Sequence, residues 1–404
     1  MEGTKKMAGK AGFTTVETSA EELAEIDAKI KAHRRKFWGR IIGIAIIILV
    51  AFAFIQIWFA LRTYDQYEVK STFKEGDNSA SHFADFDGNI IQYSNDGIVY
   101  MDNLGELIWN QAFEMTSPKL EKCGDYLAIY DAGGKDIYIM QTSGVVKQIE
   151  TSMLIKTVCV ANQGTVAVLM EEDNNFYVKL YDKTGKELAS GKFYGNKGAI
   201  PVDIALSFNA QKLAVDLIDI TGGSVKSNIS FYNFGSVGQN EINNNVGTFT
   251  YDDTLIPEIE YVSNNCMIAK GDRTIKIFEG SQKPELAREI KFKNELESVI
   301  NSNKYIAVLY SNQDEEATHH IQIYDMRGKL VMENDTPVSY TNVEFLSNNE
   351  LLINNSYNCE LYTVHSIKKF SYTFEVPMYG LLYRGGSNDY MLITESTMEE
   401  VRLR

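Results

Sequence analysis

The stretch LYDKTGKEL, residues 180–188, is the clearest copy of a pattern that organises most of the chain. Apolar residues stand on both sides of a polar turn, which Asp182 starts and in which Gly185 tolerates a positive φ. This turn chemistry predicts two antiparallel strands joined by a tight hairpin. The arrangement recurs at six other places, some of them weaker copies: 101–109, 139–147, 231–239, 277–285, 323–331 and 361–369.

The spacing of these turns predicts the fold. Successive turns are 38 to 50 residues apart, which is the length of one four-stranded propeller blade. Because a single sheet of this size cannot cover both of its apolar faces, the blades must stack around a common axis. Residues 155–193 show the four strands of one period in order: TVCVA, TVAVLME, FYVKLYD and ELASGKF.

We expect an all-β fold, an eight-bladed β-propeller, with seven blades as the alternative because the strand register over 220–260 is loose. The last period offers three strands before Arg404, whereas a strand predicted at 66–73 has no neighbours of its own. Pairing that strand with the C-terminal strand would close the ring and remove an exposed edge. The innermost strands are predicted near residues 83, 120, 157, 203, 259, 298, 342 and 380.

An apolar segment precedes the repeats. Residues 41–61, IIGIAIIILVAFAFIQIWFAL, carry no charge and as a helix would extend about 30 Å, the thickness of a bilayer's hydrocarbon core. Trp38 and Trp58 stand near its two ends, where indole rings favour the membrane interface. The Ala-Phe-Ala sequence at 51–53 resembles a signal-peptide cleavage site, but cleavage there would leave an apolar terminus, so we interpret the segment as an uncleaved anchor.

Charges beside this segment predict its orientation. Residues 31–40 carry five basic residues and no acid, and basic flanks stay in the cytoplasm. The predicted organisation is a cytoplasmic tail at 1–40 with a juxtamembrane helix at 19–36, a transmembrane helix at 41–61, and an extracytoplasmic propeller at 62–404. The tail has a net charge of +3 and the propeller −18, which argues against nucleic acid as a partner.

Ten residues in three of the turns carry a resemblance to a known repeat: Asp102, Gly105, Trp109, Asp182, Thr184, Gly185, Lys186, Asp325, Gly328 and Lys329. They resemble the Asp-x-x-Thr-Gly-Lys-x-x-Trp turn of bacterial quinoprotein-type (PQQ-like or WD40-like) β-propellers, whose tryptophan docks between blades. Here the spacing from Asp to Gly is one residue shorter, and only Trp109 stands at the docking position, with Ala189 and Met332 at the others. The layout is also similar to that of a family of single-pass anchored proteins from Firmicutes, which implies location and fold.

Two stretches suggest binding sites but are better explained by loops. The Gly-Lys pair at 185–186 lies between strands and lacks the upstream glycine and the following helix of a phosphate-binding loop. The stretch NQDEEATHH, 312–320, holds carboxylates and histidines that could bind a metal. Because His319 and His320 are adjacent on a predicted strand, they point to opposite faces and cannot easily share one ion. We interpret it as a solvated hairpin loop.

Other acidic pairs and the cysteines give no site either. The stretch DFDGN at 85–89 lacks EF-hand spacing and predicts a tight turn. Asp252-Asp253 lies in a predicted loop without a cluster of His or Arg. We expect buried free thiols, with a Cys123–Cys159 disulfide as the alternative because these residues hold matching places in successive repeats. No catalytic, cofactor-binding or metal-binding residue and no cofactor is therefore predicted.

A polar, Asn-rich insertion at 222–253 is our first candidate for a contact surface, because propeller loops often carry binding functions. The predicted function is a membrane-anchored, extracytoplasmic and non-enzymatic scaffold or recognition module for a protein or a cell-wall glycan. The alternative is a quinone- or metal-dependent propeller enzyme of the cell envelope. It would need a cofactor-stacking tryptophan near the central channel, whereas Trp109 is predicted in an outer strand.

Overall fold

The computed structural model describes residues 20–75, 78–195, 198–312 and 318–404. The chain divides into two compact units, Met1–Arg62 and Thr63–Arg404. The first unit contains the long helix α1, and the second contains the strands β1 to β32.

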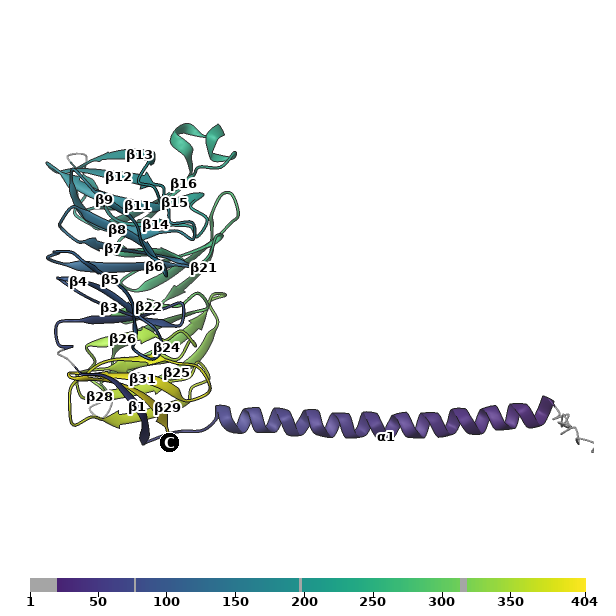
Figure 1. Cartoon of the computed structure of the whole chain (residues 1–404). Helices are drawn as coiled ribbons and strands as arrows, with labels where there is room; N and C mark the ends of the chain where they lie inside the picture. Colours follow the sequence, from purple (N-terminus) through teal and green to yellow (C-terminus); the bar gives the residue numbers. More distant parts are fainter. Residues whose placement is uncertain (1–19, 76–77, 196–197, 313–317) are drawn as a thin grey trace, which may run out of the picture. The chain divides into compact units, whose positions relative to one another are not determined.

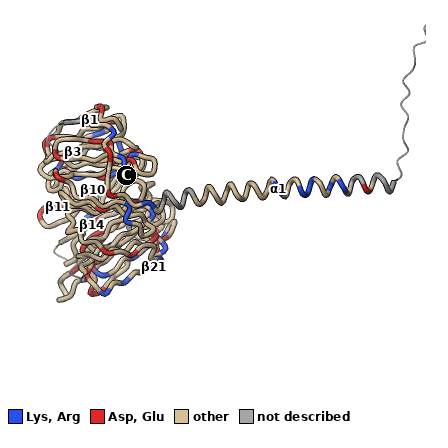
Figure 2. The backbone as a smooth tube through the Cα atoms, turned by 90° about the horizontal axis from the view of Figure 1, so that it is seen from below, with Lys and Arg blue, Asp and Glu red and all other residues tan. Residues whose placement is uncertain are grey.

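Helix α1 runs without interruption from Ala20 to Ala60. The helices expected at 19–36 and 41–61 are thus continuous, because the residues between them include no proline and a single glycine weakens a helix by only about 1 kcal/mol. Within α1, Ala28–Phe54 is long and apolar enough to cross a membrane, with a mean hydropathy of 2.4, and none of it is buried. Basic residues lie in the N-terminal part of α1, and its central part carries no charged residue (Figure 2).

The second unit is an eight-bladed β-propeller, as the sequence predicts, and the seven-blade alternative is wrong (Figure 1). Each blade is a four-stranded antiparallel sheet, and the first strands of most neighbouring blades contact each other around the centre of the ring. Each predicted inner strand coincides with the first strand of a blade.

The strands of blades 1 to 4 are β2 (His82–Phe86), β3 (Asn89–Ser94), β4 (Gly97–Met101) and β5 (Leu107–Ala112); β6 (Pro118–Cys123), β7 (Tyr126–Asp131), β8 (Asp136–Gln141) and β9 (Gly144–Glu150); β10 (Leu154–Val160), β11 (Val166–Glu172), β12 (Asn175–Tyr181) and β13 (Glu187–Tyr194); β14 (Ala199–Leu206), β15 (Lys212–Asp219), β16 (Lys226–Asn233) and β17 (Asn245–Asp252). Those of blades 5 to 8 are β18 (Glu258–Tyr261), β19 (Cys266–Lys270), β20 (Thr274–Glu279) and β21 (Glu285–Lys291); β22 (Ser298–Asn301), β23 (Tyr305–Ser311), β24 (His319–Asp325) and β25 (Leu330–Thr336); β26 (Asn342–Phe345), β27 (Leu351–Asn354), β28 (Asn358–Tyr362) and β29 (Lys368–Thr373); β30 (Met378–Tyr383), β31 (Asp389–Thr394), β32 (Thr397–Leu403) and β1 (Tyr67–Glu75).

The eighth blade combines strands from both ends of the propeller sequence. Strand β1 pairs antiparallel with β32, from Tyr67 opposite Leu403 to Glu75 opposite Thr397. In Figure 1, β1 lies beside the yellow strands at the C-terminal end of the propeller. The pairing satisfies the backbone groups along β32 that would otherwise form an exposed edge, and it closes the ring.

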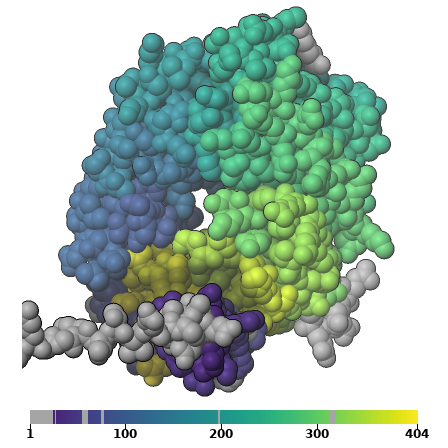
Figure 3. Space-filling model, turned by 90° about the vertical axis from the view of Figure 1, so that its right-hand side faces the viewer, coloured from purple at the N-terminus to yellow at the C-terminus, as the bar shows by residue number. Residues whose placement is uncertain are grey.

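Buried apolar side chains form eight clusters, each drawn from two neighbouring blades. Strand β11 shows how the sequence produces them. Val166, Val168 and Met170 pack toward blade 2, whereas Ala167 and Leu169 pack toward blade 4, because successive side chains of a strand point to opposite faces. The core therefore lies between the blades, and the centre of the ring remains hollow (Figure 3).

Candidate functional site

An apolar groove of about 670 Å³ separates the outer parts of blades 3 and 4. Leu180 and Ala189 line it from blade 3, and Leu213 and Tyr232 line it from blade 4. Leu188 lies at the rim with 53% of its surface exposed. Apolar side chains that line an open hollow can contact another molecule, so the groove is a candidate binding site.

An insertion, residues 234–244 between β16 and β17, contributes the polar part of this groove. It supplies the side chains of Gln239, Asn243 and Asn244 to the lining. In the six other blades in which a hairpin joins the third and fourth strands, this connection has two to five residues. The insertion also contains Ile242, which is 86% exposed and stands among polar residues.

The insertion is shorter than the sequence indicated. Much of 222–253 forms β16 and β17, which are regular strands of blade 4, because their apolar residues alternate with polar ones as in the other blades. The inserted part contains two short 3₁₀ helices, η2 (Gly238–Asn240) and η3 (Ile242–Asn244). An ion pair of 2.6 Å between Glu241 and Lys283 ties it to blade 5.

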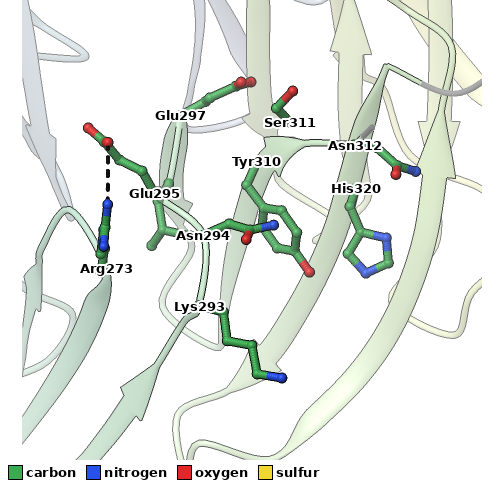
Figure 4. Close-up of a pocket in the computed structure, with 10 residues that line it drawn as sticks. Arg273, Lys293, Asn294, Glu295, Glu297, Tyr310, Ser311, Asn312 and His320 are labelled. Atoms are coloured by element: carbon green, nitrogen blue, oxygen red, sulfur yellow. Dashed lines mark ion pairs between the residues drawn. The ribbon is translucent and has the colours of Figure 1, made fainter. Parts of the chain in front are cut away.

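A second, polar hollow of about 980 Å³ lies between blades 5 and 6 (Figure 4). The connection from β21 to β22 supplies Lys293, Asn294 and Glu295, and strands β23 and β24 supply Tyr310 and His320. The stretch 312–320 thus contributes to a cavity, but residues 313–317 lie outside the described part of the chain.

The two histidines of this stretch point to different partners. His320 approaches Asp335 through Nδ1 at 2.5 Å and Glu333 through Nε2 at 2.8 Å, so both ring nitrogens are engaged. His319 instead faces Glu297, with 3.2 Å between Nε2 and Oε2. Among the residues that the structure describes, no three or more His, Cys, Asp or Glu side chains are placed to hold a metal ion.

Acidic side chains meet in the central channel. Glu121 on β6 and Glu260 on β18 line one small cavity of about 120 Å³, although they come from blades 2 and 5. The Lys270 ammonium donates hydrogen bonds to the carboxylates of Glu258 and Glu260, at 2.5 and 3.2 Å. Desolvation and the carboxylates of Glu260 and Asp203 raise the pKa of Glu121. No sequence pattern predicts this cluster, because its members belong to different repeats.

The turn of LYDKTGKEL is a hairpin turn held by one carboxylate. Asp182 Oδ1 accepts hydrogen bonds from the backbone N–H groups of Thr184 and Lys186, at 2.8 and 3.0 Å, and Gly185 has a φ of 85°. Asp102 Oδ1 and Asp325 Oδ1 accept two backbone hydrogen bonds in the same way. The predicted hairpin turn is confirmed.

The other acidic stretches also lie in turns. Asp87 and Gly88 form a two-residue hairpin between β2 and β3, with φ values of 52° and 73°, so the tight turn predicted for DFDGN is confirmed. Asp252 ends β17 and pairs with Lys226 at 2.8 Å. Asp253 follows with a φ of 50°.

All four cysteines are free, so the alternative of a Cys123–Cys159 disulfide is wrong. The Cys123 thiol donates to Asn162 Oδ1 at 2.9 Å, and the Cys159 thiol donates to the Ile204 carbonyl at 3.0 Å. Burial raises the pKa of Cys123 to about 11 and also raises that of Cys159. Because the thiolate is the reactive form, these raised pKa values disfavour reaction of the two thiols at neutral pH.

The chain is similar to several proteins of known structure. Similar solved structures are BamB from Moraxella catarrhalis (11% identity, covering 84% of this chain and 100% of that chain, TM-score 0.48), the Neurospora crassa Pan2 WD40 domain (8%, 71% and 88%, 0.44) and Kuenenia stuttgartiensis hydrazine synthase (13%, 73% and 95%, 0.45). No protein with a curated description matches the sequence. A family profile described as "Family of unknown function (DUF5711)" matches residues 60–403, which include the whole propeller apart from Arg404. The chain therefore belongs to the DUF5711 family.

Proposed function

We propose that this protein is a membrane-anchored recognition module. Helix α1 spans the bilayer with its N-terminus in the cytoplasm, and the propeller lies outside, where it binds another protein without catalysing a reaction. The apolar groove between blades 3 and 4 carries this proposal. Its lining is dominated by aliphatic and aromatic side chains, which favour the side chains of a protein over the hydroxyl groups of a glycan.

The exposure of α1 supports the anchor. Ile44, Ile47, Leu49 and Phe52 are 58–69% exposed and extend around the helix. A helix that is apolar on all sides is stable when it is buried or placed in lipid, and α1 is not buried within the chain. Five basic residues at 31–40 favour a cytoplasmic N-terminus.

The connection between the two units is short. Six residues, 61–66, separate the end of α1 at Ala60 from the start of β1 at Tyr67, and they can extend over at most about 20 Å. A propeller on this tether would work close to the membrane surface. This suits a module that holds a partner beside the membrane.

Site-specific cross-linking in cells tests the proposed function. A photo-reactive amino acid replaces Leu188 at the groove or, as a control, Ile220, which is 67% exposed in the turn between β15 and β16. That turn lies at the opposite end of blade 4 from the insertion, because β16 separates the two connections. We expect a discrete adduct from position 188 that position 220 does not give. The same cross-linked adducts from both positions, or no adduct from position 188, would refute the proposal.

A further inference from the structure

The chain enters the propeller on one particular face. Strand β1 begins at Tyr67, beside Leu403 at the end of β32, which is the place where a hairpin joins the third and fourth strands of the other blades. Just before β1, the Tyr64 N–H donates to the carbonyl of Lys369 at 2.7 Å. Lys369 is the second residue of β29, the fourth strand of blade 7, so this contact lies at the same end of its blade.

We call this side of the propeller the entry face. Because the strands of a blade alternate in direction, the hairpins between first and second strands lie on it together with those between third and fourth strands. The hairpins between second and third strands and the connections from blade to blade form the opposite face.

The chain between α1 and the entry face is short. Residues 61–63 separate Ala60, the end of α1, from Tyr64, and three residues extend over at most about 11 Å. A helix in the membrane with this connection would hold the entry face at blades 7 and 8 next to the bilayer surface.

Charge distinguishes the two faces. The hairpins of the entry face hold seven acidic and seven basic residues. The described parts of the connections on the opposite face hold nine acidic and three basic residues. Anionic lipids give a membrane a negative surface potential, which repels an acidic surface but not a neutral one. The entry face is therefore the side that can approach a membrane closely.

The insertion of blade 4 projects from the entry face on the far side of the ring. It joins β16 and β17, the third and fourth strands of its blade, and extends beyond them in Figure 1. Among eight blades, blade 4 stands opposite blade 8, and Figure 3 shows the teal-green and yellow parts of the chain on opposite sides of the central hollow. Ile242 is 86% exposed there, the largest exposed fraction among the large apolar residues that the structure describes.

Fixed contacts keep Ile242 in this exposed position. Glu241 pairs with Lys283 of blade 5 at 2.6 Å, and the side-chain amide of Asn244 donates to the Asn233 carbonyl at 3.2 Å. The groove between blades 3 and 4 uses other residues of the insertion, and Ile242 does not line it. A partner in the groove would thus leave Ile242 available for a second contact.

We infer that the entry face rests on the membrane surface and that Ile242 enters the headgroup region there, as a second attachment point half a ring away from the chain entry. This inference rests on the proposed function, since it requires α1 in the bilayer. An aliphatic side chain gains free energy when it leaves water for the boundary between headgroups and acyl chains. Two attachment points on opposite sides of the ring fix its tilt, so the groove stays beside the membrane.

Quenching by lipids measures this contact. Full-length protein with Ile242→Cys, or with Ile220→Cys on the opposite face, carries a nitrobenzoxadiazole label in nanodiscs that hold one copy each, which excludes a second copy as the source of the contact. The discs contain equal parts of phosphatidylcholine and phosphatidylglycerol, with or without a lipid that bears a nitroxide on its headgroup. We expect at least twofold stronger quenching at position 242 than at position 220. Unsubstituted protein treated with the label gives the background from the native cysteines. Because the headgroup region is hydrated, a cysteine at 242 still reacts with water-soluble reagents, only more slowly than one at 220.

A second substitution tests whether Ile242 itself holds the face down. A label on Leu188→Cys, at the start of β13 and so at the entry-face end of blade 3, reports how close that blade lies to the lipid. Adding Ile242→Asp should reduce its quenching by about half, whereas adding Ile220→Asp should leave the quenching unchanged.

Two results would overturn the inference: equal quenching at 242 and 220, or a label at 188 that does not respond to Ile242→Asp. A position-188 adduct in cells would still support the proposed function in either case. Protein that fails to enter nanodiscs would overturn both the anchor and this inference.

Discussion

Asp203 on β14 and Asp216 on β15 stand opposite each other, and Asp216 is completely buried with neither carboxyl oxygen hydrogen-bonded. Burial, together with the nearby charge of Asp203, raises the pKa of Asp216 to about 8. The folded protein therefore keeps this proton up to about pH 8, whereas an unfolded chain releases it near its ordinary value of 3.8. Because the folded state binds more protons in this range, the free energy of unfolding falls as the pH rises from about 4 to 8.

Asp216→Asn should weaken this pH dependence, because an amide has a similar shape and does not ionise, while Asp203, whose pKa burial raises to about 7, still titrates in the variant. We expect the variant to gain stability relative to the wild type as the pH rises above 4, with the gain levelling off near pH 8. Thermal unfolding at pH 4, 6 and 8 measures the difference. Asp219→Asn is the control on the same strand, since hydrogen bonds from Thr221 lower the pKa of Asp219. A parallel pH dependence of wild type and Asp216→Asn would contradict the prediction.

Asp389 lies beside β1 and β32, the strand pair that closes the ring, and it makes the free energy of unfolding depend on pH in the opposite direction. It accepts hydrogen bonds from Arg402 on β32 at 2.7 Å and from Lys70 on β1 at 2.8 Å, and these partners lower its pKa to about 2. Its stabilisation is therefore present above about pH 4 and is lost as the pH falls toward 2. Asp389→Asn should lower the urea midpoint at pH 7, and the deficit should shrink below pH 4. The exposed pair of Arg404 and Glu68 is the comparison, and Arg404→Ala should have little effect. A deficit that stays constant from pH 7 to pH 3 would argue against this role.

The fold could be predicted because each blade is encoded locally. Asp182 and Gly185 lie three positions apart and specify one turn, and alternating apolar residues specify the strands beside it. The channel cluster could not be predicted, since Glu121 and Glu260 meet only after the ring closes. The groove between blades 3 and 4 could be predicted only in part. The sequence places Ala189 seven residues after Asp182, as Trp109 follows Asp102, but Leu213 and Tyr232 reach the same space only through the packing of blade 4 on blade 3.

The proposed orientation across the membrane predicts a specific labelling pattern. Ile242 is 86% exposed, so Ile242→Cys should react with a membrane-impermeant maleimide on intact cells if the propeller lies outside. The four native cysteines are buried or partly buried, and the unmodified protein sets the background. Ala24→Cys, which lies on the N-terminal side of Ala28–Phe54, should react only after lysis. The reverse pattern would place the propeller in the cytoplasm.

Trp109 should contribute measurably to the stability of the propeller through its bridge from blade 1 to blade 2. Trp109→Ala removes the packing against Tyr100 and Tyr138 and should cost about 3 kcal/mol in urea unfolding. Trp109→Phe keeps an aromatic ring but loses the donor to the Thr142 carbonyl, so the cost should include about 1 kcal/mol for that hydrogen bond. Trp38→Ala, in α1, is the control and should not change the unfolding of the propeller. If Trp109→Ala stays within about 0.5 kcal/mol of the wild type, blades 1 and 2 are held together without this bridge.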